Sequence, residues 1–495
     1  MSAALTPLRG ELLRERNFIG GMWRTGREGV QLDVRDPACG ALVARVPDSG
    51  AADATDAVDA AFEAQEAWRA QPAQSRARLL KRWYAGIVES TEDLARIISL
   101  EQGKPLGESR GEVAYGASYV EWFAEEAVRA YGDIIPAPGS NRKLMVVKEP
   151  IGIVAAVTPW NFPLAMLARK IAPALAAGCT VVAKPAEDTP LTALALARLA
   201  EEAGVPAGVV NVITASREKA RLTVGEWLAD PRVRKITFTG STAVGKELAQ
   251  GSAVTLKKLS LELGGNAPFL VFEDADTEAA VDGLMRAKFR NGGQTCVCPN
   301  RVYVHSSVYE SFARRLVGQV ERLVVGPAHR ESSQIGPMIN TRAVEKIERH
   351  VRDAIARGAR LLTGGRRIRD SSVDGSNYYA PTVLGEARHD MALASEETFG
   401  PVIALFRFET EVDVIRQAND TPYGLAAYFY SRDAARIWRV AERLETGIVA
   451  INDGSFASAA APFGGVKESG YGREGSRYGL DEFLTTKYLC QGGLG

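Results

Sequence analysis

The sequence predicts an α/β protein with two doubly wound domains, and three observations support this. Short apolar runs of strand length alternate with helical stretches over 151–239, and a second alternation runs over 268–453. Such alternation is typical of βαβ units, in which helices cover both faces of a parallel sheet. The length of 495 residues also favours two or three cores over one. We expect the two domains to meet near 262–266.

The region before this alternation is predicted to be helical over 51–130. Ser90 and Asp93 resemble a capping box with Asp in place of Glu, so a new helix should begin there. Apolar side chains just before it recur at three- and four-residue steps, which predicts one buried helix face: Leu79, Leu80, Trp83, Tyr84, Ile87 and Val88. The pattern then becomes β-rich in the runs GDIIPAP, KLMVVKEP and IGIVAAV.

The composition argues against several classes of partner. With 60 basic and 60 acidic residues, the chain has no net field that would attract nucleic acid or a membrane surface. No run reaches the roughly 18 apolar residues that a membrane span needs. Charges also break every apolar run in 1–18, unlike a signal peptide. We therefore expect a cytoplasmic protein with no nucleic-acid or membrane partner.

Cysteine and histidine usage points to a reducing compartment and no metal. The five cysteines are too few and too scattered for a disulfide framework in a chain of this size. The four histidines show no metal-ligand spacing.

One stretch, RAKFRNGGQTCVCPNR over 286–301, is a candidate reactive site. Gly292 and Gly293 let the backbone turn sharply and approach a ligand closely, because neither residue has a Cβ. Cys296 should then lie in a tight loop at the end of a helix, where a thiol can meet a substrate. Composition alone favours a buried core cysteine, since free Cys is among the most buried residue types.

A possible nucleotide site is FTGSTAVGKE over 238–247, where a strand meets the start of a helix. The free N–H groups and the dipole of such a helix attract a phosphate. The phosphate-loop pattern is met up to Lys246, but Glu247 stands where a hydroxyl should bind magnesium. The dinucleotide fingerprint is absent as well. A plain strand-to-helix turn is the competing interpretation.

Further polar residues lie at predicted strand ends. Asn161 is either a helix cap or a functional amide, and Lys184 and Glu187 place a cation and a carboxylate at the same sheet edge. Glu262 is a carboxylate inside an apolar strand, so it needs a specific partner or a raised pKa. A raised pKa suits a general base near neutral pH, and a structural ion pair is the alternative.

Seven motifs occur in the order expected of the NAD(P)-dependent aldehyde dehydrogenase superfamily: TPWNFP, KPAE, FTGSTAVG, LELGGNAP, GGQTCVCPNR, EETFGPV and PFGGVKESGYGREG. The chain resembles this superfamily over nearly its whole length. The CVC pair, the run AKFRNGGQTCVCPNR and the ending KYLCQGGL are most similar to the succinate-semialdehyde dehydrogenases. A phosphate-loop nucleotide-binding protein and a non-catalytic descendant of the fold are the alternatives from other classes.

The resemblance implies catalytic roles for three residues. Cys296 would attack the aldehyde carbon as a thiolate and form a thiohemiacetal. The Asn161 amide and the backbone N–H of Cys296 would hold the oxyanion. After hydride transfer to the nicotinamide, Glu262 would activate the water that hydrolyses the thioester.

The resemblance also implies a set of cofactor-binding residues. Lys184 and Glu187 match adenosine-ribose ligands, and a carboxylate at 187 would repel the 2′-phosphate of NADP. We therefore expect NAD to be preferred and NADP to be possible. The remaining matches are Gly240, Ser241 and Gly245 at the pyrophosphate, and Glu397 and Phe399 at the nicotinamide ribose and ring. Trp160 is a further candidate for cofactor binding.

The expected substrate is an aldehyde with a distal carboxylate, succinate semialdehyde first and glutarate semialdehyde second. A broad-specificity aldehyde dehydrogenase is a further alternative. Arg169 and Arg290 match positions that bind the carboxylate in the succinate-semialdehyde enzymes, and guanidinium forks suit that group. Two surface ion pairs are the competing interpretation. Those enzymes often have Ser-Ser before PFGG, where this chain has Ala457 and Ser458. Either Ser455 or Ser458 substitutes for the missing serine, or the pocket takes a longer semialdehyde.

Cys298 has two interpretations. A bent loop could bring it close enough to Cys296 for a strained and easily reduced disulfide, which would make it a redox switch. It could instead be a small apolar filler of the substrate pocket.

The resemblance also predicts the domain organisation. Residues 1–131 and 152–264 would form an NAD(P)-binding domain and 265–455 a catalytic domain, while 132–151 and 475–495 would form a β-rich oligomerisation flap. Exposed edge strands of this kind call for pairing with another subunit. We expect a homotetramer or a homodimer.

Overall fold

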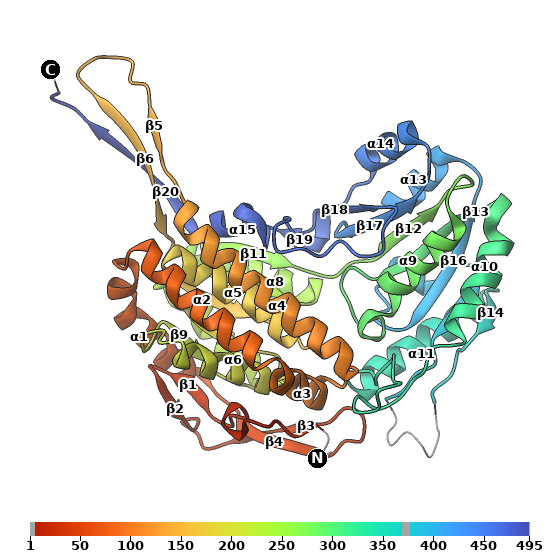
Figure 1. Cartoon of the computed structure of the whole chain (residues 1–495), viewed down its shortest axis with the longest axis horizontal. Coiled ribbons are helices and arrows are strands. Elements are labelled where there is room, and N and C mark those ends of the chain that lie inside the picture. Colours follow the sequence, from red (N-terminus) through yellow and green to blue (C-terminus); the bar gives the residue numbers. More distant parts are fainter. Residues whose placement is uncertain (1–4, 369–376, 495) are drawn as a thin grey trace.

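Two β-sheets organise the chain into two lobes (Figure 1). The computed structural model describes residues 5–368 and 377–494. Both sheets have parallel strands at their centre and helices on both faces, so the predicted α/β class is confirmed. No helix within the described ranges is long and apolar enough to span a bilayer.

The first sheet has the strand order β19-β11-β10-β7-β8-β9-β1-β2. Strands β11 to β9 pair in parallel, whereas β19, β1 and β2 add antiparallel edges. The strands span Asn17–Ile19 (β1), Met22–Arg24 (β2), Ile153–Val157 (β7), Thr180–Lys184 (β8), Val210–Val212 (β9), Val233–Thr239 (β10), Lys258–Glu262 (β11) and Gly470–Tyr471 (β19). The apolar runs between 151 and 239 therefore form strands as predicted.

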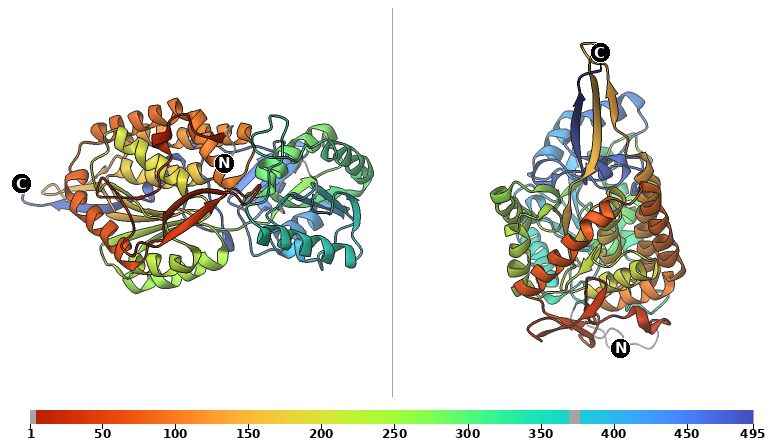
Figure 2. Two further views of the ribbon diagram at one scale, coloured as in Figure 1. Left: turned by 90° about the horizontal axis from the view of Figure 1, so that it is seen from below. Right: turned by 90° about the vertical axis from the view of Figure 1, so that its left-hand side faces the viewer.

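Helices cover the two faces of this sheet, which Figure 2 shows from below. Helix α5 (Pro163–Ala177) is buried along its whole length, as expected for a helix that is apolar on every side apart from Arg169 and Lys170. One face carries Ala73–Glu89 (α2), Thr91–Gln102 (α3), Leu106–Glu126 (α4), Pro163–Ala177 (α5) and Pro190–Glu202 (α6), and the other carries Ala51–Arg69 (α1), Arg217–Ala229 (α7) and Thr242–Ser252 (α8).

The second sheet has the order β14-β15-β16-β13-β12-β17-β18 and is parallel except for β14. Its strands are Ala267–Val271 (β12), Pro299–His305 (β13), Arg360–Thr363 (β14), Thr382–Gly385 (β15), Val402–Phe408 (β16), Ala426–Tyr430 (β17) and Ile448–Ile451 (β18). Helices Thr277–Phe289 (α9) and Ser306–Val320 (α10) pack on one face, and Thr341–Ala356 (α11), Ala392–Ser395 (α12), Glu411–Asn419 (α13) and Ala434–Arg443 (α14) on the other.

A three-stranded sheet projects from the first lobe (Figure 1). It contains Asp133–Ile135 (β5), Lys143–Pro150 (β6) and Leu484–Gln491 (β20), and β20 pairs with all of β6. The prediction that 475–495 belongs to this flap is only partly correct. Residues Ser476–Asp481 form helix α15, which packs against α4 and α5 because Leu480 and Phe483 are buried in the first core.

The remaining elements are short. A two-stranded ribbon is formed by Gln31–Arg35 (β3) and Leu42–Pro47 (β4), and 3-10 turns occur at Gly10–Leu12, Ala127–Arg129, Ala253–Thr255, Arg290–Gly293 and Lys467–Ser469.

Helix α3 begins at Thr91 as predicted, but the capping box before it is wrong. Ser90 makes no side-chain cap, and its hydroxyl accepts from the Arg9 guanidinium at 3.0 Å. Asp93 accepts from the backbone nitrogens of Leu8 and Arg9 at 2.5 and 3.3 Å. The N-terminal segment therefore takes both side chains that a local cap would have used.

Candidate active site

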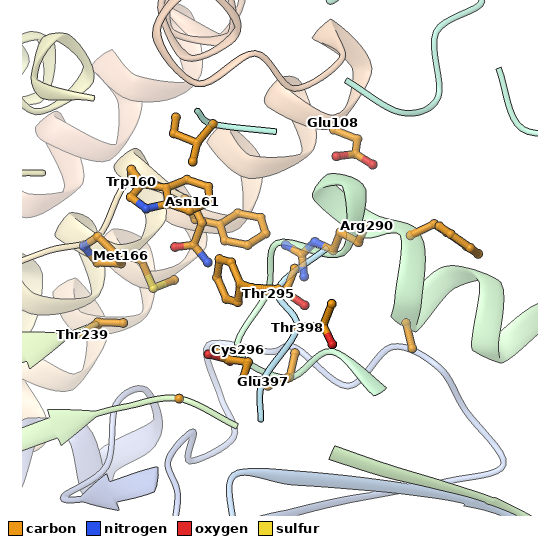
Figure 3. A pocket seen from close by; sticks show the side chains of 18 of the residues that line it. Glu108, Trp160, Asn161, Met166, Thr239, Arg290, Thr295, Cys296, Glu397 and Thr398 are labelled. Carbon is orange, nitrogen blue, oxygen red and sulfur yellow. The ribbon is translucent and has the colours of Figure 1, made fainter. Parts of the chain in front are cut away.

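A cavity of about 850 Å³ opens between the lobes, beside the carboxyl ends of β7, β10 and β11. Ligands of doubly wound sheets bind at this edge. Figure 3 shows side chains from both lobes that converge on the loop carrying Cys296. The predicted site residues that line the cavity are Trp160, Asn161, Arg169, Gly240, Ser241, Arg290, Cys296, Glu397 and Phe399.

The loop that carries Cys296 leaves helix α9 through left-handed backbone conformations. Asn291 has φ 51° and Gly292 φ 62°. A Cβ on Gly293 would lie 2.3 Å from the carbonyl oxygen of Gly400. Glycine at 293 therefore lets the loop pack directly against the segment that contains Glu397, and the tight turn predicted from the Gly-Gly pair is present.

The side-chain amide of Asn161 reaches from the first lobe to this loop. Its Nδ2 donates to the carbonyl oxygen of Gln294 at 3.0 Å. The helix-cap interpretation of Asn161 is wrong, because Glu112 on α4 caps α5 instead. The Glu112 carboxylate accepts from the backbone nitrogens of Leu164 and Ala165 at 2.9 and 3.3 Å. An amide nitrogen carries two N–H groups, so one N–H of Asn161 remains for a ligand.

Burial controls the charge state of Cys296. It raises the pKa of the thiol to about 12, with Arg169 opposing this effect and the charges of Glu397 and Glu262 adding to it. The thiol is therefore protonated at neutral pH in this structure, and a nucleophilic role requires a proton acceptor or an added positive charge.

Glu262 ends strand β11 and is 2% exposed. Neither carboxylate oxygen has a hydrogen-bond partner among the described residues. Burial, followed by the charge of Glu474, raises the pKa of Glu262 well above its ordinary value. The ion-pair alternative for Glu262 is wrong, because Arg169 and Lys170 pair with Glu474. A buried carboxyl with a raised pKa near a thiol has the properties of a general base.

Sequence reasoning missed Glu474, which lies in the loop between β19 and α15. Burial alone would raise its pKa, but Arg169 and Lys170 outweigh burial and lower it. The Lys170 ammonium also donates to Thr239 Oγ1 at 2.7 Å. The only local signal for Glu474 was its place in the PFGGVKESGYGREG motif. Charged residues in such a motif are also typical of an exposed loop, so the motif did not predict a buried carboxylate.

The segment after β10 follows the cavity into helix α8. Ser241 caps the helix, accepting from the Val244 nitrogen at 3.4 Å. The first turn also presents N–H groups that lack intrahelical partners, which suits an anion. The buried Gly245 has a packing role, since a Cβ there would lie 2.4 Å from Leu263.

The phosphate-loop interpretation does not fit the two residues that follow. Lys246 pairs with Glu468 at 2.9 Å and Glu247 pairs with Arg221 at 2.9 Å. Lys246 and Glu247 are both exposed, and neither lines the cavity. Their side chains therefore form surface ion pairs.

A second cluster of predicted cofactor-binding residues lines the cavity. Trp160 and Phe399 meet edge to face, with ring centroids 5.5 Å apart. Glu397 accepts from the Gly265 nitrogen at 3.1 Å, and burial raises its pKa to about 7. Lys184 and Glu187 lie at the end of β8 outside the cavity lining, where the Lys184 ammonium donates to the carbonyl oxygen of Pro185 at 3.0 Å.

The two candidate arginines have different environments. Arg169 is 2% exposed and pairs with Glu474, so its charge is already neutralised. Arg290 stands over the rings of Tyr115 and Phe162, 5.4 and 4.7 Å from their centroids. It forms no ion pair with any described residue. The surface ion pairs proposed as the alternative are therefore absent for both.

The prediction that Ser458 lines the pocket is wrong. Its hydroxyl accepts from the Ala460 nitrogen at 3.3 Å within a turn, and this turn directs Ser455 and Ala457 to the cavity instead.

Cys298 lies outside the cavity lining, so the pocket-filler interpretation is wrong. Its thiol is 1% exposed and donates to the carbonyl oxygen of Lys288 at 3.7 Å. Cys296 and Cys298 are both free thiols in this structure. Across the part of the chain that the structure describes, no group of His, Cys, Asp and Glu is suited to hold a metal ion.

Comparisons with known proteins agree with this arrangement. A family profile described as the aldehyde dehydrogenase family matches residues 23–489. A 3-sulfolactaldehyde dehydrogenase of Pseudomonas putida is 52% identical over 484 residues, covering 98% of both chains. The succinate-semialdehyde dehydrogenase (NADP(+)) of Escherichia coli strain K12 is 51% identical over 481 residues, covering 97% of this chain and 98% of the relative.

A solved structure of the succinate-semialdehyde dehydrogenase from Burkholderia pseudomallei is also similar. It superposes with a TM-score of 0.96 at 52% identity, over 98% of this chain and 99% of that one.

Proposed function

Because the chain belongs to the aldehyde dehydrogenase family, whose members oxidise aldehydes to carboxylic acids with NAD(P), we propose succinate semialdehyde as its substrate. The observation that carries this proposal is Arg290. Its guanidinium lines the same cavity as Cys296 and is not neutralised by any described carboxylate within ion-pair distance. A distal carboxylate of a short aldehyde is the complement of such a group.

Cys296 is the nucleophile in this proposal. Its Sγ attacks the aldehyde carbon and gives a thiohemiacetal. Because burial raises the pKa of the thiol to about 12, its proton must leave as the bond forms. Glu262 is the acceptor, directly or through a water. The second N–H of Asn161 Nδ2 and the backbone N–H of Cys296 hold the oxyanion, and each such donor is worth ~10²–10³ in rate.

The residues around the cavity fit a nicotinamide dinucleotide. The buried carboxyl of Glu397 and the Trp160–Phe399 pair line the cavity, and Gly240 with Ser241 at the start of α8 offers N–H groups to a pyrophosphate. When bound, the cofactor accepts the hydride that leaves the thiohemiacetal carbon. The protein keeps the thioester on Cys296 in place.

Glu262 then acts on water. Once the proton taken from Cys296 has passed to solvent, the Glu262 carboxylate removes a proton from a water that attacks the thioester carbonyl. That proton then goes to the departing sulfur, so Cys296 leaves as the thiol. Neither carboxylate oxygen of Glu262 accepts a hydrogen bond from the described residues, so both can accept one from a water.

Several anionic aldehydes share the chemistry that Arg290 would recognise. The relatives named for succinate semialdehyde and 3-sulfolactaldehyde both act on short aldehydes with an acidic group at the far end. Glutarate semialdehyde, one methylene longer, is the second candidate, because Ala457 stands where the resemblance leads us to expect a serine. Ser455 lines the cavity together with Ala457.

NAD as the preferred cofactor remains our proposal from Glu187, while the similarity to an enzyme named for NADP(+) supports NADP use as well. We also propose that the β5–β6–β20 flap joins two or four copies. Ile134 and Tyr488 on this flap are 83% and 58% exposed. Light scattering after gel filtration gives the copy number, and a monomer would exclude this part of the proposal.

A panel of aldehydes tests the substrate. We expect kcat/KM to be highest for succinate semialdehyde, lower for glutarate and 3-sulfolactaldehyde, and lowest for propanal, measured as NAD(P)H absorbance. Propanal at the top of the series would exclude a distal-anion substrate, while the oxidation itself would still be established.

A further inference from the structure

Lys104 is a buried lysine whose ammonium reaches the backbone of Asn161. It is 2% exposed and follows directly after helix α3. Its Nζ donates to the Asn161 carbonyl oxygen at 2.7 Å and to Glu112 Oε2 at 2.6 Å. The Nζ also lies 4.0 Å from the centre of the Phe162 ring, in cation–π geometry. Two of these three contacts are to Asn161 and the residue that follows it.

Glu112 completes this connection through its second oxygen. While Oε2 accepts from Lys104, Oε1 caps the first turn of α5 through Leu164 and Ala165. The Lys104–Glu112 pair therefore ties the carbonyl of Asn161 and the start of α5 to helix α4. Motion of either partner would move the Asn161 side chain.

The loop of the nucleophile is held from the same side. Gln102 Nε2 donates to Asn291 Oδ1 at 3.1 Å, and Asn291 Nδ2 donates to the Asn161 carbonyl oxygen at 2.9 Å. That oxygen thus receives two donors, Lys104 from the first lobe and Asn291 from the second. Residues 102–104 therefore contact the backbone of Asn161 and, through Asn291, the start of the loop that carries Cys296.

Stability alone does not account for this pair. Two charges that are 99% buried pay a large desolvation cost, and replacement of such pairs by apolar residues is often neutral or stabilising. Because Lys104 also donates to the backbone carbonyl of Asn161, we expect the pair to fix the position of Asn161.

We propose that Lys104, held by Glu112, is a positioning residue that fixes the Asn161 amide against the Cys296 loop. This inference rests on the proposed function, in which Asn161 binds the oxyanion. A displacement of about 1 Å at a reacting group can cost ~10²-fold in rate.

The first experiment compares Lys104→Met with Lys235→Met. Lys235 is also fully buried, bonded to Ser260 Oγ at 2.5 Å and 3.5 Å from Glu482, but neither partner belongs to the proposed oxyanion site. We expect Lys104→Met to lower kcat by about 10–100-fold with KM close to wild type. Lys235→Met should lower the melting temperature and leave kcat unchanged. Equal loss of kcat in the two variants would overturn the proposal.

A double-mutant cycle tests whether Lys104 acts through Asn161. Asn161→Ala keeps the backbone carbonyl that Lys104 binds but removes the amide. If the amide is what Lys104 positions, adding Lys104→Met to Asn161→Ala lowers kcat no further. Multiplied losses would mean that Lys104 acts by another route, and the proposal would fail.

A double variant without the buried charges separates a folding defect from a loss of positioning. Lys104→Met combined with Glu112→Gln buries no charge, so we expect the melting temperature to return toward wild type while kcat stays low. Recovery of kcat together with stability would assign the pair a structural role only.

Acylation of Cys296 by p-nitrophenyl acetate separates this inference from the proposed function, because it needs neither an aldehyde nor a cofactor. The oxyanion of this reaction uses the same amide, so Lys104→Met should slow nitrophenolate release by a similar factor. An unchanged acylation rate in Lys104→Met would overturn the positioning role, even if the wild type oxidises no semialdehyde.

Discussion

Asn161 Nδ2 lies 3.0 Å from the carbonyl oxygen of Gln294, two residues before Cys296. This hydrogen bond joins the end of strand β7 in the first lobe to the turn after α9 in the second. It leaves the other N–H of the amide for a ligand in the cavity that Asn161 and Cys296 both line. The proposed oxyanion site therefore exists only when the two lobes are held in register.

Asn161→Ala should remove one oxyanion donor and lower kcat by ~10²–10³-fold with little change in KM. Asn211→Ala is the matched control, since Asn211 is fully buried but bonds to the carbonyl oxygens of Val181 and Gly208. That variant should lose stability and keep kcat. Steady-state kinetics and thermal melts on both variants decide the matter.

Glu262 predicts a pH dependence of the hydrolytic step. Burial and then Glu474 raise the pKa of Glu262, and a carboxyl is a base only above its pKa, so thioester hydrolysis should speed up as the pH rises through that raised value. Glu262→Gln removes both the acceptor of the Cys296 proton and the base that activates water, so it should slow the formation of NAD(P)H, and any thioester that forms should persist on Cys296. A pH profile of the variant that parallels the wild type would argue against this base.

Arg290→Ala should raise KM for succinate semialdehyde and lower its kcat/KM by ~10²-fold, as expected for a lost charge-assisted contact of about 1.5–3 kcal/mol. Propanal oxidation should change little. Arg286→Ala is the control, because Arg286 also borders the cavity but its side chain is 58% exposed and 3.9 Å from Asp453. Equal effects of the two variants on both substrates would contradict the carboxylate clamp.

Glu187 predicts the cofactor preference. A carboxylate about 4 Å from a 2′-phosphate is repelled by roughly 4 kcal/mol at an effective dielectric near 20, and solvent at this half-buried side chain reduces that value. Glu187→Gln should therefore raise kcat/KM for NADP more than for NAD. Asp188→Asn changes a neighbouring charge and should not alter the ratio. A wild type equally efficient with both cofactors would show that Glu187 does not discriminate.

The Cys298→Ala variant tests whether Cys298 forms a reversible disulfide with Cys296. After mild peroxide and then dithiothreitol, a disulfide with Cys296 would protect the nucleophile, so wild type should recover fully while Cys298→Ala drifts to sulfinic acid. Because burial raises the pKa of Cys298 and its thiol faces Lys288, the loop must rearrange first. Equal recovery of both proteins would mean that Cys298 takes no part.

The strands, the helices and the Cys296 loop could be predicted because their signals are local. The alternation of apolar runs predicted both sheets. The Gly292–Gly293 pair predicted the sharp turn, since only residues without a Cβ adopt it easily at this packing density. The apolar setting of Glu262 correctly predicted a carboxyl with a raised pKa.

The helix caps could not be predicted in this way. Helix α6 begins without a local side-chain cap, and Glu101 from α3 accepts from its Leu191 and Thr192 nitrogens at 2.7 and 2.9 Å. Glu112 does the same for α5. A carboxylate 52 or 90 residues away satisfies an N–H as well as a neighbouring serine does, and no local pattern marks it.

Charge pairing was likewise decided by the tertiary structure. The resemblance made Arg169 a candidate for the substrate clamp, but Glu474, which is 304 residues from Lys170, pairs with both Arg169 and Lys170. Arg290 has no such partner among the described residues. The sequence by itself determined the elements and the candidate residues that those elements carry. Only the folded chain decided which charges neutralise one another, because pairing depends on distances between elements and not on their order.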